Sequence, residues 1–250
     1  MKAMVLAAGL GTRLRPLTDD RPKALVKISG RTLLDITLAR LRSVGIRDVI
    51  LNVHHFADMV VDFLQAHDNY GMRIVISREG ELLDTGGGLK RAAYFFLEDS
   101  GPADQPFLVH NVDVISTIDL NRMLRAHKET EALATLAVQQ RETSRPLLFD
   151  DHLQLCGRGV GSDGKNETVR TCSQPQPFAF SGIHVISTRL LRQLSEDGAF
   201  SIITSYLRLA GQGETIRAFR ADEYYWRDLG RLAHVQQVED EVSQRIVQLP

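Results

Sequence analysis

Short apolar runs alternate with longer amphipathic stretches along the first half of the chain. The longer stretches carry apolar residues at helical spacing, as in Leu34, Leu38 and Leu41 and again from Leu89 to Phe96. The short runs are continuously apolar, which is typical of strands buried on both faces. These runs are Ala3–Ala7, Val49–Val53, Ile74–Ile76 and Phe107–Val109. Strand and helix in regular succession predict an α/β fold with a mostly parallel sheet and helices on both faces.

The alternation loosens after Asp119, and residues 135–186 are mostly of β type. Two apolar triplets, 147–149 and 153–155, flank Asp150-Asp151 and predict a hairpin. The glycine-rich stretch 157–166 predicts a mobile loop.

The rest of the chain returns to alternating elements. Helices are expected near 188–195 and 202–209, strands near 215–219 and 225–228, and a final helix with an apolar stripe of Leu232, Val235, Val238, Val242 and Ile246. No internal repeat and no linker is visible. We therefore expect one domain over residues 1–250, composed of a first half (1–118) and a second half (119–250) that includes the final helix.

Composition and charge exclude several classes of protein. Hydrophobic residues make up 43% and charged residues 24% of the 250 residues, which are ordinary globular values. The net charge is −1 and no basic run is present, which argues against a nucleic-acid partner. The apolar start at Met4–Ala8 is too short for a signal peptide or a membrane span, so we expect a cytoplasmic protein without a membrane partner. Cys156 and Cys172 lack C-x-x-C spacing and are expected to be reduced thiols.

The loop after the first apolar run is rich in glycine and carries two cations. Residues 6–26 read LAAGLGTRLRPLTDDRPKALV. The glycine spacing is not that of a Walker loop, and Leu14 stands where a dinucleotide fingerprint needs its third glycine. What remains is a loop with exposed backbone N–H groups, in which Lys23 follows Arg13 by ten positions. Glycine lets a backbone approach a polyanion and arginine can bind two phosphate oxygens, although Gly9 and Gly11 alone would fit a simple tight turn equally well.

Five stretches of the chain carry a common resemblance. The first is the loop itself, L-A-A-G-x-G-T-R-L-x-P-L-T followed by P-K-x-L. The others are Thr85–Lys90 (TGGGLK), Asn111-Val112-Asp113, Phe180–Ile183 and Trp226–Gly230. In content and order they resemble the sugar-1-phosphate nucleotidyltransferases, and the resemblance covers essentially the whole chain. It implies the nucleotide-diphospho-sugar transferase fold, a Rossmann-like sheet with a small β-rich sugar-binding part and, since the chain stops after one further helix, no β-helix domain.

The resemblance implies a reaction in which a sugar 1-phosphate attacks the α-phosphorus of a nucleoside triphosphate and pyrophosphate leaves. A sugar phosphate is already anionic at neutral pH, so its attack needs charge cancellation and positioning and no general base. By resemblance, Arg13 holds the departing phosphates and Lys23 bridges the α-phosphate and the sugar phosphate. Further nucleotide contacts are expected from Leu6, Ala8, Gly9, Gly11, Thr12, Thr85 and Gly86. Sugar contacts are expected from Asn111 and Gly182.

Two cations cannot balance a triphosphate and a monophosphate together, so a divalent metal is expected. Mg²⁺ prefers a few carboxylates and completes its shell with phosphate oxygens and water. By resemblance the metal pair is Asp113 and Asp228, with Asp113 also counted as catalytic. Taken alone, Asp228 would fit the N-cap of the final helix, and Asp119 is a better cap than a ligand.

Glu79 stands five positions before Asp84, where family members place a Gln or Glu that reads the base. A carboxylate can accept from the N3–H of a pyrimidine or from two N–H groups of guanine. Glu79 therefore indicates uracil, thymine or guanine, and UTP, GTP or dTTP as the nucleotide, without choosing among them. The alternative is an exposed loop acid.

Departures from the family pattern bear on the sugar. Many relatives have a Glu-Lys-Pro motif before the F-x-G strand, and this chain reads VRTCSQP at 169–175, so that lysine contact is missing or comes from another group such as Arg170. Val112 adds bulk where relatives have Gly or Ala before the metal aspartate. His54 and His55 are expected to be loop residues at the pocket rim. These features together look most like the compact N-acetylmuramate-1-phosphate uridylyltransferases.

Three alternatives stay open. Compact mannose-1-phosphate guanylyltransferases and glucose-1-phosphate thymidylyltransferases share the same features. A catalytically silent sugar-nucleotide sensor would belong to another class, but Arg13, Lys23 and both aspartates of the metal pair are present. We expect a monomer or a homodimer, since part of the apolar face of the last helix could serve a dimer.

Overall fold

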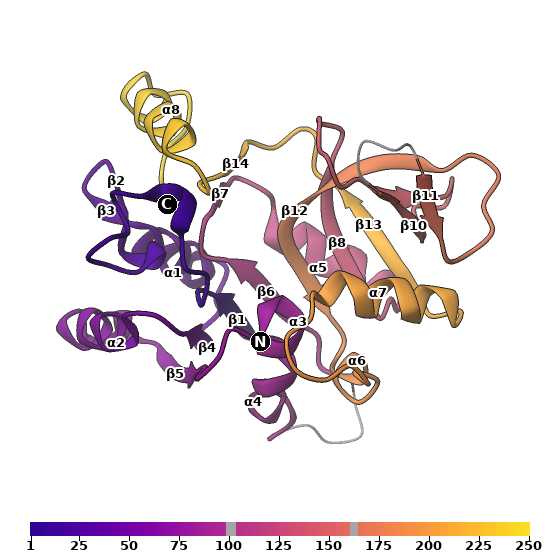
Figure 1. Cartoon of the computed structure of the whole chain (residues 1–250), viewed down its shortest axis with the longest axis horizontal. Helices are drawn as coiled ribbons and strands as arrows, with labels where there is room; N and C mark the ends of the chain where they lie inside the picture. The colour runs from indigo at the N-terminus through magenta and orange to yellow at the C-terminus, as the bar shows by residue number, and fades with distance from the viewer. Residues whose placement is uncertain (99–103, 161–164) are drawn as a thin grey trace.

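The computed structural model describes residues 1–98, 104–160 and 165–250, and its centre is a mixed β-sheet (Figure 1). The strands of the main sheet follow the order β5-β4-β1-β6-β12-β8-β13. Their bounds are β1 (Lys2–Leu6), β4 (Asp48–Val53), β5 (Arg73–Arg78), β6 (Phe107–Asn111), β8 (Ala134–Gln139), β12 (Gln176–Ile186) and β13 (Ile216–Arg220). All of these strands are parallel to one another except β12, which is antiparallel to both of its neighbours.

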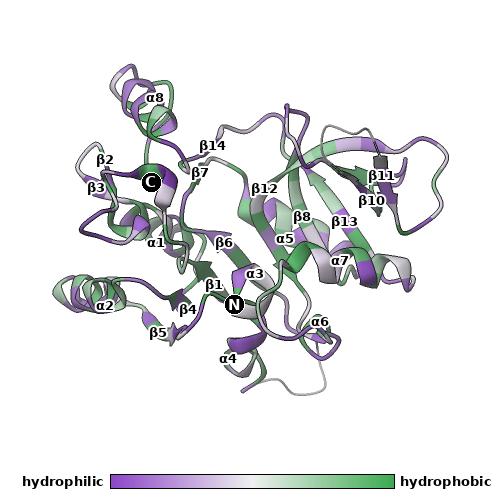
Figure 2. Cartoon of the chain, viewed as in Figure 1, coloured by the Kyte–Doolittle hydropathy of each residue, from purple (hydrophilic) through white to green (hydrophobic). Residues whose placement is uncertain are grey.

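Helices cover both faces of this sheet. Side chains alternate along each strand, so Ala3 and Val5 of β1 join one hydrophobic core and Met4 joins the other. The first core packs against α1 (Leu33–Ser43), α2 (Ala57–Ala66), α5 (Leu120–Glu129) and α8 (Leu232–Ser243). The second packs against α3 (Asp84–Arg91), α4 (Ala93–Leu97), α6 (Thr188–Leu191) and α7 (Ile202–Gly211). Figure 2 shows hydrophobic residues along the central strands β1, β8 and β12. The predicted α/β fold is confirmed.

A smaller antiparallel part extends from the long strand β12. Its first residues, Gln176–Phe178, pair with β9 (Leu147–Phe149), which continues into β10 (Leu155–Val160) and β11 (Lys165–Thr168). The turn between β9 and β10 is fixed by Asp150, whose carboxylate accepts from the backbone N–H groups of His152 and Gln154. The predicted hairpin and the predicted β-rich part are therefore both present.

The prediction of a mobile loop over 157–166 is wrong for the residues that the structure describes. Residues 157–160 and 165–166 are paired strand residues of β10 and β11, and residues 161–164 lie outside the described part. The glycines serve close packing: a Cβ on Gly157 would lie 2.3 Å from the carbonyl oxygen of Glu167, and one on Gly159 would lie 2.7 Å from the Pro146 ring. Glycine is required here because another part of the chain approaches closely.

Three helices differ from their predicted bounds. The stripe from Leu89 to Phe96 is divided between α3 and α4, and α6 ends at Leu191. Helix α8 ends at Ser243, so Ile246 lies beyond it and is 62% exposed, whereas Val235 and Val238 are buried in the core. Asp119 is the N-cap of α5, as predicted, because its side chain accepts from the N–H of Arg122.

The last helix returns to the first half of the chain. Helix α8 packs beside β2 (Lys27–Ile28), which pairs with β3 (Arg31–Thr32), and in Figure 1 it lies over the early, indigo part of the molecule. On the way, β14 (Trp226–Asp228) pairs with β7 (Val114–Ser116). The described helices include none that is long and apolar enough to cross a membrane.

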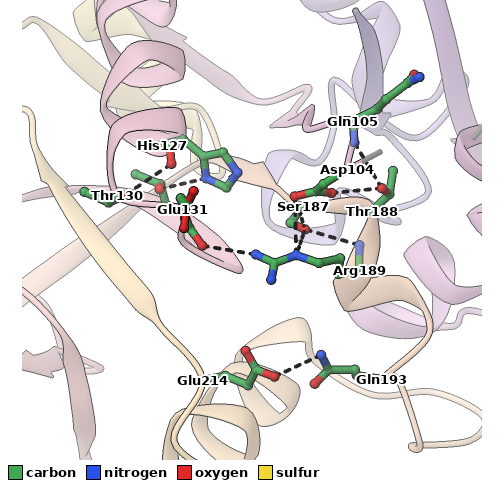
Figure 3. A network of polar contacts seen from close by, with 11 residues as sticks. Asp104, Gln105, His127, Thr130, Glu131, Ser187, Thr188, Arg189, Gln193 and Glu214 are labelled. Carbon is green, nitrogen blue, oxygen red and sulfur yellow. Dashed lines mark hydrogen bonds and ion pairs between the residues drawn. The ribbon is translucent and has the colours of Figure 1, made fainter. Parts of the chain in front are cut away.

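A polar network joins the start of β6 to the N-terminus of α6 (Figure 3). The Asp104 carboxylate accepts from the hydroxyls of Ser187 and Thr188 at 2.6 and 3.0 Å. Arg189 donates to the Ser187 hydroxyl and to the carbonyl oxygen of Glu131. Although burial opposes it, these hydrogen bonds and the Arg189 charge hold the pKa of Asp104 below its ordinary value. The network joins the segment before β6, the segment after α5 and the N-terminus of α6.

Both cysteines are free, as predicted, but the fold brings them together. The sulfur atoms of Cys156 and Cys172 lie 2.8 Å apart, with Cys156 buried. Burial is the main cause that raises the pKa of the Cys156 thiol to about 12. A thiol with such a pKa is a poor nucleophile at neutral pH.

Candidate active site

A crevice of about 490 Å³ opens at the carboxyl ends of the parallel strands β1, β4, β5 and β6. In an open α/β sheet this edge is where ligands bind. The crevice is lined by Leu6, Ala7, Ala8, Gly9, Leu10, Gly11, Thr12, Arg13, Lys23, Asn52, Glu79, Leu82, Asp84, Thr85, Asn111, Val112, Asp113 and Gly230. Most of the residues that the sequence predicts for the site are in this set.

The glycine-rich loop presents backbone N–H groups to the crevice. No N–H group from Ala8 to Gly11 donates to another residue in the described parts of the chain. The loop then turns into a short 3-10 helix, Thr12–Leu14, and Gly11 enters that turn with a φ of +66°. A Cβ on Gly11 would lie 3.0 Å from Thr18 and 3.2 Å from Lys23, so only glycine combines this conformation with this packing. Unpaired N–H groups on a turn form a concavity suited to an anion.

The two cations of the loop differ in their surroundings. Lys23 is only 8% exposed, and its ammonium group forms an ion pair with the carboxylate of Asp113. Arg13 is exposed, and within the described ranges it has neither an ion pair nor a side-chain hydrogen bond. Its guanidinium lies close to Gly230, since a Cβ there would be 2.9 Å from Arg13 Nη2. Arg13 is thus free to bind an anion, and Lys23 is held beside a carboxylate.

Of the predicted metal pair, Asp228 ends strand β14, and Asp113 lies in the turn directly before its partner strand β7. Strand β14 is antiparallel to β7, and the N–H of Leu229 donates to the carbonyl oxygen of Asp113 at 2.8 Å. Asp228 is not the cap of α8: that position belongs to Arg231, and Asp228 accepts from the N–H of Gly230 at 2.5 Å. Asp113 lines the crevice, whereas Asp228 is not among the lining residues, although its neighbour Gly230 is. Carboxylate oxygens are the ligands that a hard divalent cation prefers.

Glu79 is buried at the other end of the crevice, only 5% exposed, and is not the exposed loop acid of the alternative interpretation. Its Oε1 accepts from the side-chain amide of Asn52 at 2.7 Å and its Oε2 accepts from the N–H of Leu83 at 3.1 Å. The Asn52 carbonyl oxygen in turn accepts from the N–H of Ala7. Each carboxylate oxygen has two lone pairs, so Glu79 is fixed in place and still able to accept from a ligand.

The TGGG stretch contributes less to the crevice than predicted. Thr85 lines it, and its hydroxyl accepts from the N–H of Ile202 at 3.0 Å. Gly86 does not line it: its N–H donates to the carbonyl oxygen of Phe200, and a Cβ there would lie 2.3 Å from the Phe200 ring. Gly86 is needed for the packing of α3 against the start of α7.

The two predicted sugar residues are in contact with each other. Asn111 lines the crevice, and Gly182 is buried directly behind it with a φ of +72°. A Cβ on Gly182 would lie 2.8 Å from the Asn111 amide nitrogen. Gly182 therefore acts on the crevice through the position of Asn111. Val112 is 3% exposed and also lines the crevice.

A model of the nucleotidyl transferase family matches residues 2–147, more than half of the chain. The chain belongs to the nucleotidyl transferase family. The matched range holds the glycine-rich loop, Glu79, Asn111 and Asp113. Among curated proteins, this nucleotidyltransferase is 34% identical over 237 residues to the N-acetylmuramate alpha-1-phosphate uridylyltransferase of Caulobacter vibrioides, with 91% of each chain covered. It is 29% identical to the mannose-1-phosphate guanyltransferase of Yarrowia lipolytica, with 92% of this chain and 61% of that protein covered. The predicted enzyme class, sugar-1-phosphate nucleotidyltransferase, is confirmed.

Solved structures share the fold of this nucleotidyltransferase. HddC from Yersinia pseudotuberculosis, complexed with GMP-PN, superposes with a TM-score of 0.75 at 22% identity, covering 96% of this chain and 99% of that one. The UDP-glucose pyrophosphorylase from Acinetobacter baumanii gives a TM-score of 0.79 at 17% identity, with coverages of 99% and 95%. The nucleotide-diphospho-sugar transferase fold expected from the motifs is confirmed.

Two residues of this nucleotidyltransferase that the sequence suggested for the crevice or its rim, Arg170 and His54, are not among the residues that line it. Arg170 lies outside the crevice and its guanidinium donates to the side chain of Gln154. His54 is not among the crevice residues, and its Nδ1 is bonded to the carbonyl oxygen of Glu79 at 2.9 Å. His54 thus supports the strand end that carries Glu79.

Sequence reasoning missed Asn52, which links the glycine-rich loop to Glu79. A signal was available, because Asn52 is a polar residue inside the apolar run Val49–Val53. A buried amide in such a run needs partners, and here both of its ends are hydrogen-bonded.

Proposed function

We propose that this enzyme transfers a uridylyl group from UTP to N-acetylmuramate 1-phosphate, forming the UDP-sugar and pyrophosphate. The observation that carries the choice of substrate is the 34% identical relative of that activity, which is matched over 91% of both chains. The guanyltransferase relative is matched over 61% of its length. A compact uridylyltransferase is therefore the better template for the whole chain.

The triphosphate is assigned to the glycine-rich loop. The free N–H groups from Ala8 to Gly11 would donate to its oxygens, and Arg13 would bind the departing β- and γ-phosphates. Lys23, already held at the crevice by Asp113, would lie between the α-phosphate and the sugar phosphate and reduce their repulsion. No side chain needs to remove a proton, because the attacking phosphate oxygen is anionic at neutral pH.

Asp113 and Asp228 would hold a divalent cation, which we take to be Mg²⁺. When bound, the cation supplies positive charge to the reacting phosphates and orients them. In the metal-bound enzyme Asp113 would share its carboxylate between the cation and Lys23, while the Gly230 N–H keeps the Asp228 carboxylate oriented.

Glu79 is assigned to the uracil base. Its carboxylate would accept from the N3–H of uracil, and the Asn52 amide and Leu83 N–H hold it for that contact. The same carboxylate suits thymine and guanine, which keeps mannose-1-phosphate guanylyltransferase as the second candidate and glucose-1-phosphate thymidylyltransferase as the third.

The test is pyrophosphate release in a matrix of nucleotides and sugar phosphates with Mg²⁺. UTP, GTP, dTTP and ATP are each paired with the 1-phosphates of N-acetylmuramate, N-acetylglucosamine, mannose and glucose. The proposal predicts the highest kcat/KM for UTP with N-acetylmuramate 1-phosphate. Preference for GTP with mannose 1-phosphate would replace it with the second candidate, and binding of nucleotide without turnover in any pair would favour the silent sensor.

Two expectations stay predictions under this proposal. They are the cytoplasmic location, which suits a nucleotide-sugar enzyme, and a monomeric or homodimeric state. Fractionation of the source cells and sedimentation of the purified protein check them.

A further inference from the structure

The topology of the sheet places Arg141 at the strand ends where the crevice opens, although Arg141 is not among the residues that line the crevice. Strand β8 is parallel to β6, because both are antiparallel to β12, which lies between them. Their carboxyl ends therefore meet at one edge, where β6 carries Asn111 and leads to Asp113. Arg141 follows the end of β8 by two residues, at the same edge.

The backbone around Arg141 is tied to the segment that leads to Asp228. The Gln139 amide donates to the carbonyl oxygens of Ala221 and Tyr224 at 2.8 and 2.9 Å. The N–H of Gln140 donates to the Asp222 carboxylate at 2.6 Å. These bonds hold the end of β8 against the approach to β14.

The guanidinium of Arg141 is stacked and only partly bonded. Its central carbon lies 3.7 Å from the centre of the Trp226 ring, and Nη2 donates to the Phe180 carbonyl oxygen at 2.8 Å. Nε is buried and has no partner. In the described part of the chain no carboxylate forms an ion pair with Arg141, although a guanidinium offers five N–H donors.

Arg141 is a half-buried cation, and no acidic side chain in the described part of the chain forms an ion pair with it. Burial lowers the pKa of Arg141, and the negative charge of Asp228, which lies on the same strand as Trp226, acts in the opposite direction. Asp228 precedes Gly230, which approaches Arg13. A half-buried arginine that stacks on the strand of a candidate metal carboxylate and is largely unpaired is suited to an anionic ligand.

We propose that Arg141 binds the phosphate group of the acceptor sugar 1-phosphate, the contact for which the chain lacks a Glu-Lys-Pro lysine. The inference rests on the proposed function as far as the acceptor is a sugar phosphate, whichever sugar it carries. The phosphate is favoured over a carboxylate on the sugar because Arg141 stacks on Trp226, which shares strand β14 with Asp228, the residue assigned to the cation of the reacting phosphates. Arg170, the residue that the sequence suggested, donates to the Gln154 side chain and has no hydrogen bond or ion pair with β14 or with Asp228 in the described part of the chain.

The test compares Arg141→Gln and Arg141→Lys with the wild-type enzyme and with Arg192→Gln, a matched control at an exposed position in the turn after α6. KM for each substrate and kcat are measured with N-acetylmuramate 1-phosphate and with glucose 1-phosphate. Thermal melting and UTP binding by calorimetry report whether each variant folds. We expect Arg141→Gln to raise KM for either sugar phosphate about 10- to 100-fold, as expected for a lost charge-assisted contact, with UTP binding unchanged. Arg141→Lys should recover part of the loss, and Arg192→Gln should match the wild type.

The other outcomes separate the failure of this inference from that of the proposed function. A wild-type enzyme that turns over no sugar phosphate would overturn the proposed function. An active wild type with an unchanged sugar-phosphate KM in Arg141→Gln would overturn only the inference, as would a loss confined to the muramate substrate, which would assign Arg141 to the sugar carboxylate. Equal weakening of UTP and sugar phosphate with a lowered melting temperature would make Arg141 a structural support for Trp226.

Discussion

The two halves of the chain build their parts of the crevice in different ways. In residues 1–118 one continuous loop supplies the anion donors and both cations, and direct hydrogen bonds join Ala7, Asn52 and Glu79. In residues 119–250 Arg141, Gly182 and Asp228 come from three distant segments, brought together by strand register and by packing on Trp226. Under the proposed function, most of the groups that bind the triphosphate would come from one continuous motif, whereas sugar recognition would also need residues from distant segments of the chain.

The largest effect is expected in the first half, at Lys23. Lys23→Met removes a buried cation next to Asp113 and should lower kcat/KM on the order of 10³-fold, because the repulsion between the two phosphates is no longer reduced. Lys27→Met, at an exposed position of β2, is the matched control. Pyrophosphate release and thermal melting are measured together. A folded Lys23→Met enzyme with more than a tenth of wild-type activity would remove Lys23 from the reaction.

Glu79→Gln should separate nucleotide recognition from sugar recognition. The amide replaces an oxygen that accepts from Asn52 or from Leu83 with a donor, so the side chain loses one of the two hydrogen bonds that hold it in position for the base. KM for UTP should rise about 10- to 100-fold while KM for the sugar phosphate stays the same. Glu81→Gln, which is exposed, is the control. Equal KM changes for the two substrates would contradict the assignment of Glu79 to the base.

Gly182→Ala should have a smaller effect than Glu79→Gln, and it should change KM for the sugar phosphate and leave KM for UTP unchanged. Gly198 has a similar φ of +69° with nothing near its Cβ position, whereas a Cβ on Gly182 would press on Asn111. Both alanine variants should lose about 1 kcal/mol of stability from the left-handed backbone. Only Gly182→Ala should also raise KM for the sugar phosphate, by about tenfold, through the shifted Asn111. If kinetics of the two variants agree, Asn111 does not depend on Gly182.

Lowering the pH should reduce the free energy of unfolding, because buried histidines lie at the boundary between the two halves, where β6 pairs with β12. His110 on β6 and His184 on β12 are fully buried, and burial lowers their pKa values to about 4 and about 3. His127 in α5 is likewise lowered to about 4. These histidines stay neutral in the folded state, so the free energy of unfolding is unaffected above the ordinary pKa of 6.5 and falls as the pH drops from 6.5 towards 4.

Each buried histidine should contribute a slope of about 1.4 kcal/mol per pH unit in that window. Urea unfolding at a series of pH values measures it. His127→Asn should reduce the slope by the contribution of one histidine. His152→Gln, at an exposed position, should leave the slope unchanged. A flat profile between pH 6.5 and 4 would show that the three rings take up protons in the folded state as readily as in the unfolded state, which would contradict their lowered pKa values.

Much of the first half could be predicted from the sequence, although α2 and the short strands β2, β3 and β7 were not. Continuous apolar runs fixed the parallel strands, and the residues from Leu6 to Lys23 that line the crevice stand in one motif. Asn52 was missed because a single polar residue in an apolar run does not reveal which groups it will bond.

The second half was harder to predict, because the local sequence there does not show which distant residues pack together in the fold. The glycines of 157–166 looked like a loop but allow strands and Pro146 to approach closely. The same limit applies in the first half at Gly86, which is expected to contact the nucleotide but packs on Phe200. Arg141 carries no motif that the sequence analysis recognised, and only the antiparallel insertion of β12 shows that β8 ends beside β6.

The proposal that Glu79 in the first half recognises the nucleotide and Arg141 in the second half recognises the sugar phosphate is tested most directly by comparing Glu79→Gln and Arg141→Gln. Both variants are measured in one two-substrate kinetic assay. The account predicts that Glu79→Gln raises only KM for UTP and that Arg141→Gln raises only KM for the sugar 1-phosphate. If each variant raised both KM values to the same extent, the two halves would not divide the recognition of the two substrates, and the account would be wrong.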